Sequence, residues 1–337
     1  MQSGRLDSVL PIEIGGTHTR CGIARTEHRP ERVGSFDNAD HPDLPSVIAA
    51  YLDELAGAAP RRAALAAAGP PDDGPVELTN LGWTLDRRGL EQRFGWTDTV
   101  VVNDFEALAC AVPLLAPKEL FPVQDAQPTP LPEADNSRAK VAPRAPVAVL
   151  GPGTGLRVSG LVPCNNRWYP IRGEGGHATL AATDDRETGI VRRLRLQYGH
   201  VSAERVLCGP GLLALYRLIA GRPKAGSPLD VTRLAGSGNE DARQALDLFF
   251  RFLGTVAGDL ALTLGVRGGV YLGGGILPIL KERLAESGFA SRFRDKGRFS
   301  DYVRNIPVYL ILAETPALRG LMVHPHVQRL MGIQVST

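Results

Sequence analysis

The sequence predicts an α/β protein, because strand-like and helix-like segments alternate along its 337 residues. Segment 42–55 has apolar residues at helical spacing, whereas 61–69 is a continuous apolar run typical of a buried strand. Segment 99–115 begins as a strand and continues as a helix. Segments 10–24 and 147–162 share one plan, in which two strands flank a turn of glycines and a threonine. Such alternation favours helices layered on a sheet.

The N-terminal half should therefore open with a β-hairpin, followed by a helix at 42–55. A buried strand at 61–69 comes next, and a further strand is expected at 76–83. In 99–115 the apolar pattern changes at Asp104, so we expect a strand before this residue and a helix after it.

The C-terminal half repeats the strand–turn–strand plan after an unusual segment. Residues 122–146 are rich in proline and polar residues, which predicts an exposed excursion with little regular structure. Segment 239–265 is expected to form one long amphipathic helix, with Asn239 as its cap and Gly265 as its stop. Segment 267–278 is predicted to be a short strand that runs into three glycines before a further helix.

The composition is that of an ordinary folded protein. Hydrophobic residues make up 43% and charged residues 22%, and a net charge of +2 gives no reason to expect nucleic acid or an anionic membrane as a partner. The four cysteines are scattered, so neither a zinc site nor a disulfide framework is predicted. No secretion signal is apparent at the N-terminus, and no apolar run has the length of a membrane span. We expect a cytoplasmic protein.

Glycine-rich turns are the first candidates for a ligand site. One turn comprises Gly15, Gly16 and Thr17, and the matching turn comprises Gly153, Thr154 and Gly155. Glycine in a turn can mean only that the backbone needs a positive φ. Two such turns at matching places favour a phosphate site, because backbone N–H groups can face an anion without an intervening Cβ. Together they could hold one polyphosphate from both sides.

A third glycine cluster, Gly273-Gly274-Gly275, separates a predicted strand from a helix. It is compatible with the approach of a flat ligand such as adenine, and equally with close packing of the strand and the helix. The usual nucleotide motifs are absent from the sequence. There is no Walker A lysine motif, no G-x-G-x-x-G at the first strand, and neither of the protein-kinase motifs H-R-D and D-F-G.

Asn103 and Asp104 stand at the C-terminal end of a predicted strand, where ligands bind in α/β folds. Asp104 could simply cap the following helix, but a cap explains only one of the two polar residues. A carboxylate at this place could also accept a proton from an attacking hydroxyl. Both interpretations of Asp104, cap and general base, stay open.

The segment G-E-G-G-H at 173–177 presents Glu174 and His177 among three glycines. Carboxylate and imidazole groups hydrogen-bond to neighbouring hydroxyls, which suits a polyol, although a surface turn with incidental charges would look similar. Glu204 precedes a Gly-Pro-Gly break, and taken alone it is typical of a solvated glutamate favoured by a helix dipole.

Together these motifs resemble those of bacterial glucokinases, in the branch without the zinc-binding cysteine cluster of the repressor-related sugar kinases. The resemblance rests on E-I-G-G-T, V-N-D-F-E-A, G-P-G-T-G-L, G-E-G-G-H, S-A-E-R-V-L-C-G-P-G-L and the Gly-Gly-Gly-Ile stretch, which occur here in the family's order. It extends from about residue 10 to the end of the sequence.

The resemblance implies an actin-like ATPase (ribonuclease H-like) fold with two α/β domains around a cleft. The small domain would comprise 1–114 and 314–337, and the large domain 115–313. The resemblance also implies phosphorylation of the glucose 6-hydroxyl by ATP with Mg²⁺, usually in a homodimer.

The resemblance also assigns roles by motif. Asp104 corresponds to the family's catalytic base. The substrate-binding residues would be Asn103, Asp104, Glu174, His177 and Glu204. The nucleotide-binding residues would be Glu13, Gly15, Gly16, Thr17, Gly153, Thr154, Gly155, Gly274 and Gly275. No side chain is assigned as a metal ligand.

Three positions depart from the family's pattern. Glu13 stands where aspartate is usual, His18 where asparagine is usual, and Arg157 where glycine is usual. Glu13 is one methylene longer than aspartate, and Mg²⁺ tolerates little departure from octahedral geometry. Two alternatives therefore stay open, namely a sugar-binding regulator with weak or no kinase activity and a kinase for a different hexose.

Overall fold

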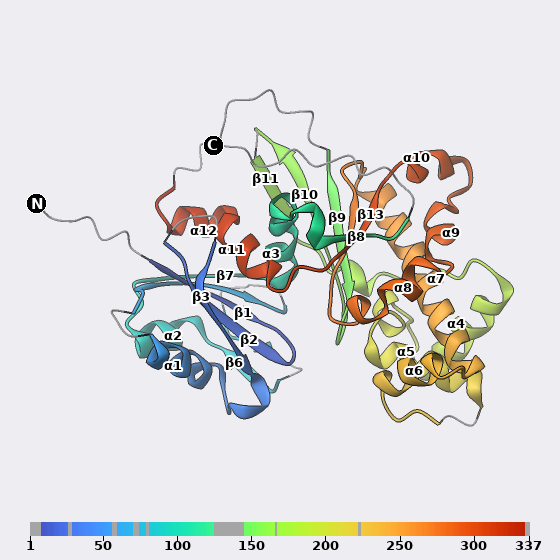
Figure 1. The fold of residues 1–337 in the computed structure, drawn as a ribbon, viewed down its shortest axis with the longest axis horizontal. Helices are drawn as coiled ribbons and strands as arrows, with labels where there is room; N and C mark the ends of the chain where they lie inside the picture. Colours follow the sequence, from blue (N-terminus) through green and yellow to red (C-terminus); the bar gives the residue numbers. More distant parts are fainter. Residues whose placement is uncertain are drawn as a thin grey trace, which may run out of the picture. The chain divides into compact units, whose positions relative to one another are not determined.

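The computed structural model describes residues 8–25, 29–55, 59–69, 74–78, 81–124, 145–165, 167–221 and 224–333. The chain forms two compact units, whose elements are labelled in Figure 1. The first unit comprises Met1–Leu115, Cys164–Arg172 and Ala313–Thr337, and the second comprises Ala116–Pro163 and Gly173–Leu312. Most of the predicted excursion at 122–146 lies outside the described residues.

A five-stranded sheet forms the centre of the first unit, in the order β3-β2-β1-β4-β7. Its strands are β1 (Val9–Ile14), β2 (His18–Ile23), β3 (Glu31–Asp37), β4 (Arg62–Ala67) and β7 (Asp98–Asn103). Strands β1, β4 and β7 are parallel, whereas β2 and β3 are antiparallel to their neighbours. The C-terminal ends of the parallel strands share one edge, so the glycine turn after β1 and Asn103 lie along the same edge.

Helices cover both faces of this sheet (Figure 1). They are α1 (Leu44–Glu54), α2 (Arg87–Phe94), α3 (Asp104–Ala111), α11 (Pro316–Val323) and α12 (Pro325–Leu330). Side chains alternate across a strand, so β1 sends Leu10 and Ile12 into the cluster with α1 and α2 and sends Val9 toward α3, α11 and α12. Both faces are thereby buried, as expected for parallel strands.

The crossing of α3 and α11 is unusually close because Gly320 lies there. A Cβ on Gly320 would collide with the backbone oxygen of Ala107 and lie 2.5 Å from the backbone nitrogen of Ala111. No side chain larger than hydrogen can be accommodated without separating the helices. Since α3 begins at Asp104, this crossing helps to fix where that carboxylate lies.

The second unit is built on a sheet in which its own strands follow the order β10-β9-β12-β13-β8, and β11, at the end of this sheet, belongs to the first unit. The strands are β8 (Leu120–Pro122), β9 (Val147–Pro152), β10 (Leu156–Cys164), β11 (Arg167–Ile171), β12 (Val270–Leu272) and β13 (Val308–Ile311). Strands β9, β12 and β13 are parallel, whereas β10 returns antiparallel to β9 after the second glycine turn.

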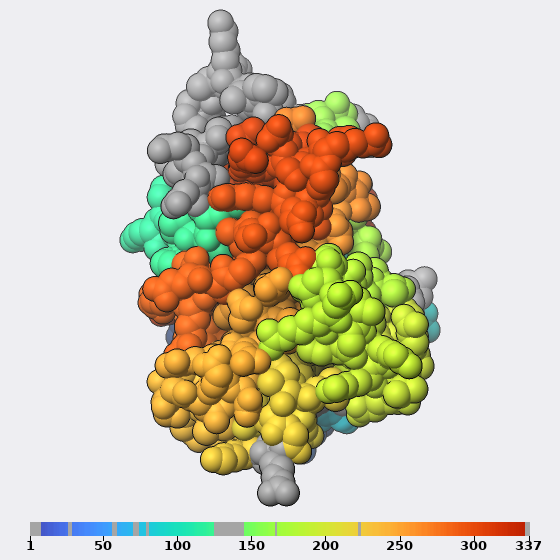
Figure 2. Space-filling view, turned by 90° about the vertical axis from the view of Figure 1, so that its right-hand side faces the viewer, coloured from blue at the N-terminus to red at the C-terminus, as the bar shows by residue number. Residues whose placement is uncertain are grey.

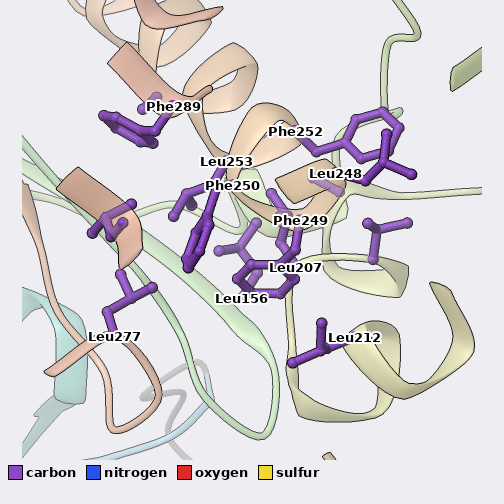
Figure 3. Packing of buried hydrophobic residues seen from close by; sticks show 14 of the residues in the cluster. Leu156, Leu207, Leu212, Leu248, Phe249, Phe250, Phe252, Leu253, Leu277 and Phe289 are labelled. Atoms are coloured by element: carbon purple, nitrogen blue, oxygen red, sulfur yellow. The ribbon is translucent and has the colours of Figure 1, made fainter. Parts of the chain in front are cut away.

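The long helix α7 is the centre of the second hydrophobic core. Its Phe249, Phe250 and Phe252 are buried, and Figure 3 shows Leu156 and Leu207 beside Phe249. The helices of this unit are α4 (Asp185–Tyr198), α5 (Gly209–Ala220), α6 (Pro228–Gly236), α7 (Glu240–Thr263), α8 (Lys281–Ala285), α9 (Phe289–Arg294) and α10 (Ser300–Arg304). Leu156, the first residue of β10, is thus anchored in the core of its unit.

A buried ion-pair network joins three helices of the second unit. Arg292 of α9 donates to Asp184 and to Glu187, each at 2.7 Å, and Arg251 of α7 donates to Asp184 at 3.0 Å. Glu187 is fully buried, and its other oxygen accepts from Thr183. In Figure 2 the yellow-green segment that carries α4 lies beside the orange segments of the C-terminal half. Glu187 and Arg292 are thus paired as a buried charge requires, whereas the buried Nε of Arg251 lies 3.7 Å from Glu187 Oε1 without a hydrogen bond to any described residue.

Most of the predicted elements are confirmed. The two hairpins form, and the helix at 42–55, the strand at 61–69 and the change from strand to helix at Asp104 are all present. The long helix is capped by Asn239, whose side chain accepts from the N–H of Ala242 at 2.9 Å.

Two predictions from the sequence were wrong. The strand expected at 76–83 is instead an antiparallel pair, β5 (Val76–Leu78) and β6 (Trp83–Leu85), because Gly82 turns the chain with a φ of +65°. The Gly-Pro-Gly segment after Glu204 does not break the structure but begins α5, where proline suits the first turn.

Several single turns of 3-10 helix connect the larger elements. They are η1 (Asn38–Asp40), η2 (Val112–Leu114), η3 (Pro117–Glu119), η4 (Gly175–His177), η5 (Ala203–Arg205), η6 (Leu277–Leu280) and η7 (Gly297–Phe299). Among the helices of the described ranges, none combines the length and apolarity needed to cross a bilayer.

We expect Gly320→Ala to lower the free energy of unfolding by about 1–3 kcal/mol, because the added methyl forces α11 away from α3. Urea unfolding followed by circular dichroism measures the change. Gly189→Ala is the matched control, since Gly189 lies in α4 and an added Cβ there meets nothing within 4 Å. If the two variants were equally stable, the close helix crossing would be contradicted.

Candidate active site

The turn between β1 and β2 is tight because of contacts rather than unusual backbone angles. Gly15 donates to the carbonyl oxygen of His18 at 3.0 Å. A Cβ on Gly15 would lie only 2.9 Å from that same oxygen. Neither Gly15 nor Gly16 has a positive φ, so the expected need for left-handed backbone is not the reason for glycine here. Glycine is needed at position 15 because a Cβ there would lie too close to the His18 carbonyl oxygen.

Asn38 holds this turn from outside it, and sequence reasoning missed it. Its Nδ2 donates to the carbonyl oxygen of Gly15 at 2.9 Å, and its backbone N–H donates to that of Thr17 at 2.8 Å. Its Oδ1 accepts from the hydroxyl of Thr19 at 2.8 Å. The Asn38 side chain is buried and makes these bonds across 19 to 23 residues of sequence. No local pattern signals such a role.

Glu13 lies in the first unit close to Asp104. It is the cross-strand neighbour of Arg20, whose guanidinium Nη1 lies 3.6 Å from Glu13 Oε1. Burial raises the pKa of the Glu13 carboxyl; Arg20 opposes this rise and the charge of Asp104 adds to it. Among the described residues, Glu13 Oε2 has no hydrogen-bond partner although it is buried. A buried carboxylate oxygen of this kind can accept a donor or a cation.

The structure separates the two roles that were open for Asp104. Asn103 is the cap of α3, because its Oδ1 accepts from the N–H groups of Phe105 at 2.9 Å and Glu106 at 3.3 Å. Its Nδ2 donates to the carbonyl oxygen of Gly69 at 3.3 Å. Asp104 is the first residue of the helix, and its Oδ1 accepts from the N–H of Phe105 at 2.9 Å. The cap therefore does not explain the presence of Asp104.

Glu106 is a buried carboxylate two residues after Asp104 and was also missed. His324 Nε2 lies 3.2 Å from Glu106 Oε2. His324 Nδ1 accepts from the backbone N–H of His326, so Nε2 carries the proton and donates to the carboxylate. Arg172 Nε lies 3.0 Å from the other oxygen without hydrogen-bond alignment, and we count this contact as an ion pair. Glu106 thus ties α3 to the residue that precedes the G-E-G-G-H segment.

In the second unit, the G-E-G-G-H segment forms the 3-10 turn η4. His177 Nε2 lies 3.9 Å from Glu174 Oε2, and His177 Nδ1 lies 4.0 Å from Glu204 Oε1. Both separations exceed hydrogen-bond length, and the His177 side chain is 61% exposed. The arrangement presents two carboxylates and an imidazole to one ligand, as expected for a polyol site.

The second glycine turn is held by Glu204. The N–H of Leu156 donates to Glu204 Oε2 at 2.9 Å. Within the turn, Gly153 donates to the carbonyl oxygen of Gly155 at 2.7 Å, and the carbonyl oxygen of Gly153 accepts from Gly209 at 2.9 Å. This turn is therefore connected to both η5 and the start of α5.

Of the two interpretations of the third glycine cluster, close packing explains Gly274. This residue has a φ of +87°, and a Cβ on it would collide with the carbonyl oxygen of Pro152. A Cβ on Gly275 would meet nothing within 4 Å, so packing does not explain that glycine.

The predicted site residues fall into two sets. The first unit holds Glu13, the Gly15–Thr17 turn, Asn103 and Asp104 at one sheet edge. The second unit holds Glu174, His177, Glu204, the Gly153–Gly155 turn, Gly274 and Gly275. The first set offers carboxylates and backbone donors, and the second offers hydroxyl-binding groups beside a glycine turn. In the part of the chain that the structure describes, no group of three or more His, Cys, Asp or Glu residues could hold a metal ion.

Comparison with known proteins agrees with this chemistry. The family model described as glucokinase matches residues 10–327. A glucokinase of Nitrobacter hamburgensis is 44% identical over 315 residues, which is 92% of this chain and 94% of the relative. A glucokinase of Aromatoleum aromaticum is 43% identical and covers 91% of either chain.

A solved structure also resembles this chain throughout. The crystal structure of glucokinase from an Antarctic psychrotroph gives a TM-score of 0.79 at 35% identity, over 94% of this chain and 98% of that chain. The likeness confirms the α/β, actin-like ATPase fold expected from the motifs. A family model and relatives that match nearly the whole sequence lead to one conclusion: the chain belongs to the glucokinase family.

Proposed function

We propose that the protein is a glucokinase that transfers the γ-phosphoryl group of ATP to the 6-hydroxyl of glucose. One observation carries this proposal: a member of the glucokinase family has both a carboxylate suited to a base and a cluster suited to a sugar. The carboxylate is Asp104, which begins α3 without being its cap, and the cluster is Glu174, His177 and Glu204. No separate observation favours a regulator without catalysis.

Hexose binding falls to Asn103, Glu174, His177 and Glu204 in this proposal. Glu174 and Glu204 accept hydrogen bonds from hexose hydroxyls, and His177 lies 3.9–4.0 Å from both, close enough for one sugar ring to contact all three. Asn103 contributes its amide while its oxygen caps α3. The number of carboxylates suits a sugar with several adjacent hydroxyls.

Asp104 acts as the general base. It occupies the first position of α3, and Asn103 accepts from the N–H groups of Phe105 and Glu106 as the cap of the helix. Asp104 accepts the proton of the 6-hydroxyl as the bond to phosphorus forms and the bond to the ADP oxygen breaks. Phosphoryl transfer of this kind depends mainly on positioning and charge stabilisation.

The glycine turns bind the phosphates, and Glu13 serves the metal-bound nucleotide. The partnerless, buried Oε2 of Glu13 fits a hard cation or its water ligands. Mg²⁺ would neutralise charge on the β- and γ-phosphates. In the same proposal the N–H groups of Gly16, Thr17, Thr154 and Gly155 bind the phosphates, while those of Gly15 and Gly153 close their turns, and Gly275 lies near adenosine.

The remaining attributes follow the family resemblance. We assign residues 1–114 with 314–337 to a small domain and 115–313 to a large domain, and we expect a homodimer in the cytoplasm. Size-exclusion chromatography with light scattering tests the dimer.

Asp104→Asn should reduce turnover of glucose by about 10²–10⁴-fold, because the amide cannot accept the hydroxyl proton. It keeps an oxygen for the N–H of Phe105, so α3 should stay intact. A coupled assay of glucose 6-phosphate measures turnover, and calorimetry should show glucose affinity within about threefold of wild type.

Asp86→Asn is the matched control for this variant, because Asp86 is an exposed carboxylate at the start of α2 in the same unit. It should retain full turnover. Near-normal turnover by Asp104→Asn would remove Asp104 from the mechanism, and faster turnover of mannose or glucosamine than of glucose would reassign the substrate.

Asn38→Ala should raise the KM for ATP by about tenfold, because the carbonyl oxygen of Gly15 in the first glycine turn loses its side-chain donor. Glucose affinity without nucleotide should not change. Ser46→Ala is the control, since it removes a 2.7 Å hydrogen bond to the carbonyl oxygen of Asp43, away from the turn. An unchanged KM for ATP in Asn38→Ala would show that the turn does not depend on Asn38.

A further inference from the structure

Glu204 contacts two functional segments with its two carboxylate oxygens. Oε2 accepts the N–H of Leu156 at 2.9 Å, at the end of the Gly153–Gly155 turn. Oε1 faces Nδ1 of His177 at 4.0 Å, in the proposed hexose site. The Glu204 side chain is 31% exposed, so it is partly accessible although it hydrogen-bonds to the turn.

Gly155 makes this arrangement possible. A Cβ on Gly155 would collide with Glu204 Oε2 and would lie 3.2 Å from the carboxylate carbon. Gly155 is not among the described glycines with positive φ, so its backbone would tolerate alanine. The absence of a side chain at Gly155 therefore serves the carboxylate of Glu204 rather than the backbone conformation.

Backbone contacts also join the segments that carry His177 and Glu204 to each other and to the Gly153–Gly155 turn. Ala203 donates to the carbonyl oxygen of Ala178 at 2.8 Å, and Leu180 donates to that of Val201 at 3.0 Å. A Cβ on Gly176 would collide with the carbonyl oxygen of Leu156. The peptide groups of Leu156 thus contact Glu204 on one side and the G-E-G-G-H segment on the other.

Leu156 itself is rigidly held. Its side chain is buried in the core of the second unit, beside Leu207 and Phe249 (Figure 3). A displacement of Glu204 therefore cannot be followed by Leu156 without repacking that core. In this hydrogen bond the donor residue, Leu156, is held by the core. The acceptor, Glu204, is partly exposed and belongs to the proposed hexose site.

We propose that Gly155 is a positioning residue for hexose binding, because it leaves the space in which Glu204 bridges the hexose site and the second phosphate turn. This inference rests on the proposed function. A glycine that belongs by motif to the nucleotide side of the site thereby determines affinity for the sugar. The bound hexose, in turn, fixes Oε1 of Glu204 and with it the bond to Leu156.

The test is the dissociation constant for glucose, measured by calorimetry without nucleotide. Gly155→Ala should raise it at least about tenfold, which corresponds to a disturbed hydrogen bond to a charged group. Gly236→Ala is the matched comparison, because Gly236 lies in α6, outside the proposed site, and an added Cβ there meets nothing within 4 Å. Its glucose affinity should stay within about twofold of wild type.

A double-mutant cycle separates positioning from a general loss of structure. In the Glu204→Asp background the carboxylate is one methylene shorter, so the methyl group that Gly155→Ala adds no longer meets it. Adding Gly155→Ala to Glu204→Asp should then weaken glucose binding by less than about twofold more. A full additional tenfold loss would overturn the inference, as would a Gly155→Ala protein with wild-type affinity or an equal loss in Gly236→Ala. A wild-type protein that binds no glucose would instead refute the proposed function.

Discussion

The hydrogen bond from the N–H of Leu156 to Glu204 is the interaction on which the proposed hexose site depends. It exists because Gly155 leaves no Cβ in the way, and because Leu156 is fixed in a core built around α7. A residue drawn from η5 thereby reaches the end of a turn 48 residues earlier in the chain. Gly15, Gly155 and Gly320 are needed because other atoms approach their Cα atoms closely, and not because their backbone has a positive φ.

In the first unit, too, glycines allow backbone groups to approach closely. Gly15 allows its own turn to close on His18, and Gly320 allows α11 to approach α3. Asn103 caps α3, so Asp104, the proposed base, is not needed as the cap of that helix. Helix α3 is then tied at its first turn through Glu106 to His324, so the position of the proposed base depends on the C-terminal segment of the chain.

The sequence predicted the periodic elements and the glycine turns well, because these depend on local patterning. It did not reveal Asn38 or Glu106, since their partners lie 19 to 23 and 218 residues away. The grouping of 164–172 with the N-terminal unit was also not apparent. Positive φ does not explain Gly15, where a Cβ would instead meet the carbonyl oxygen of His18 in the same turn. The motifs identified the candidate residues, but only the fold shows which of them cap, support or remain accessible.

One carboxylate, that of Glu204, joins the sugar to the second phosphate turn in this account. Amide hydrogen exchange of Leu156, followed by NMR with and without glucose and in the absence of nucleotide, tests this claim most directly. Because a bound hexose would immobilise Glu204, the account predicts slower exchange at Leu156 once glucose is present, with little change at the N–H of Ala242 in the cap of α7. Equal exchange at Leu156 in free and glucose-saturated protein would contradict the claim.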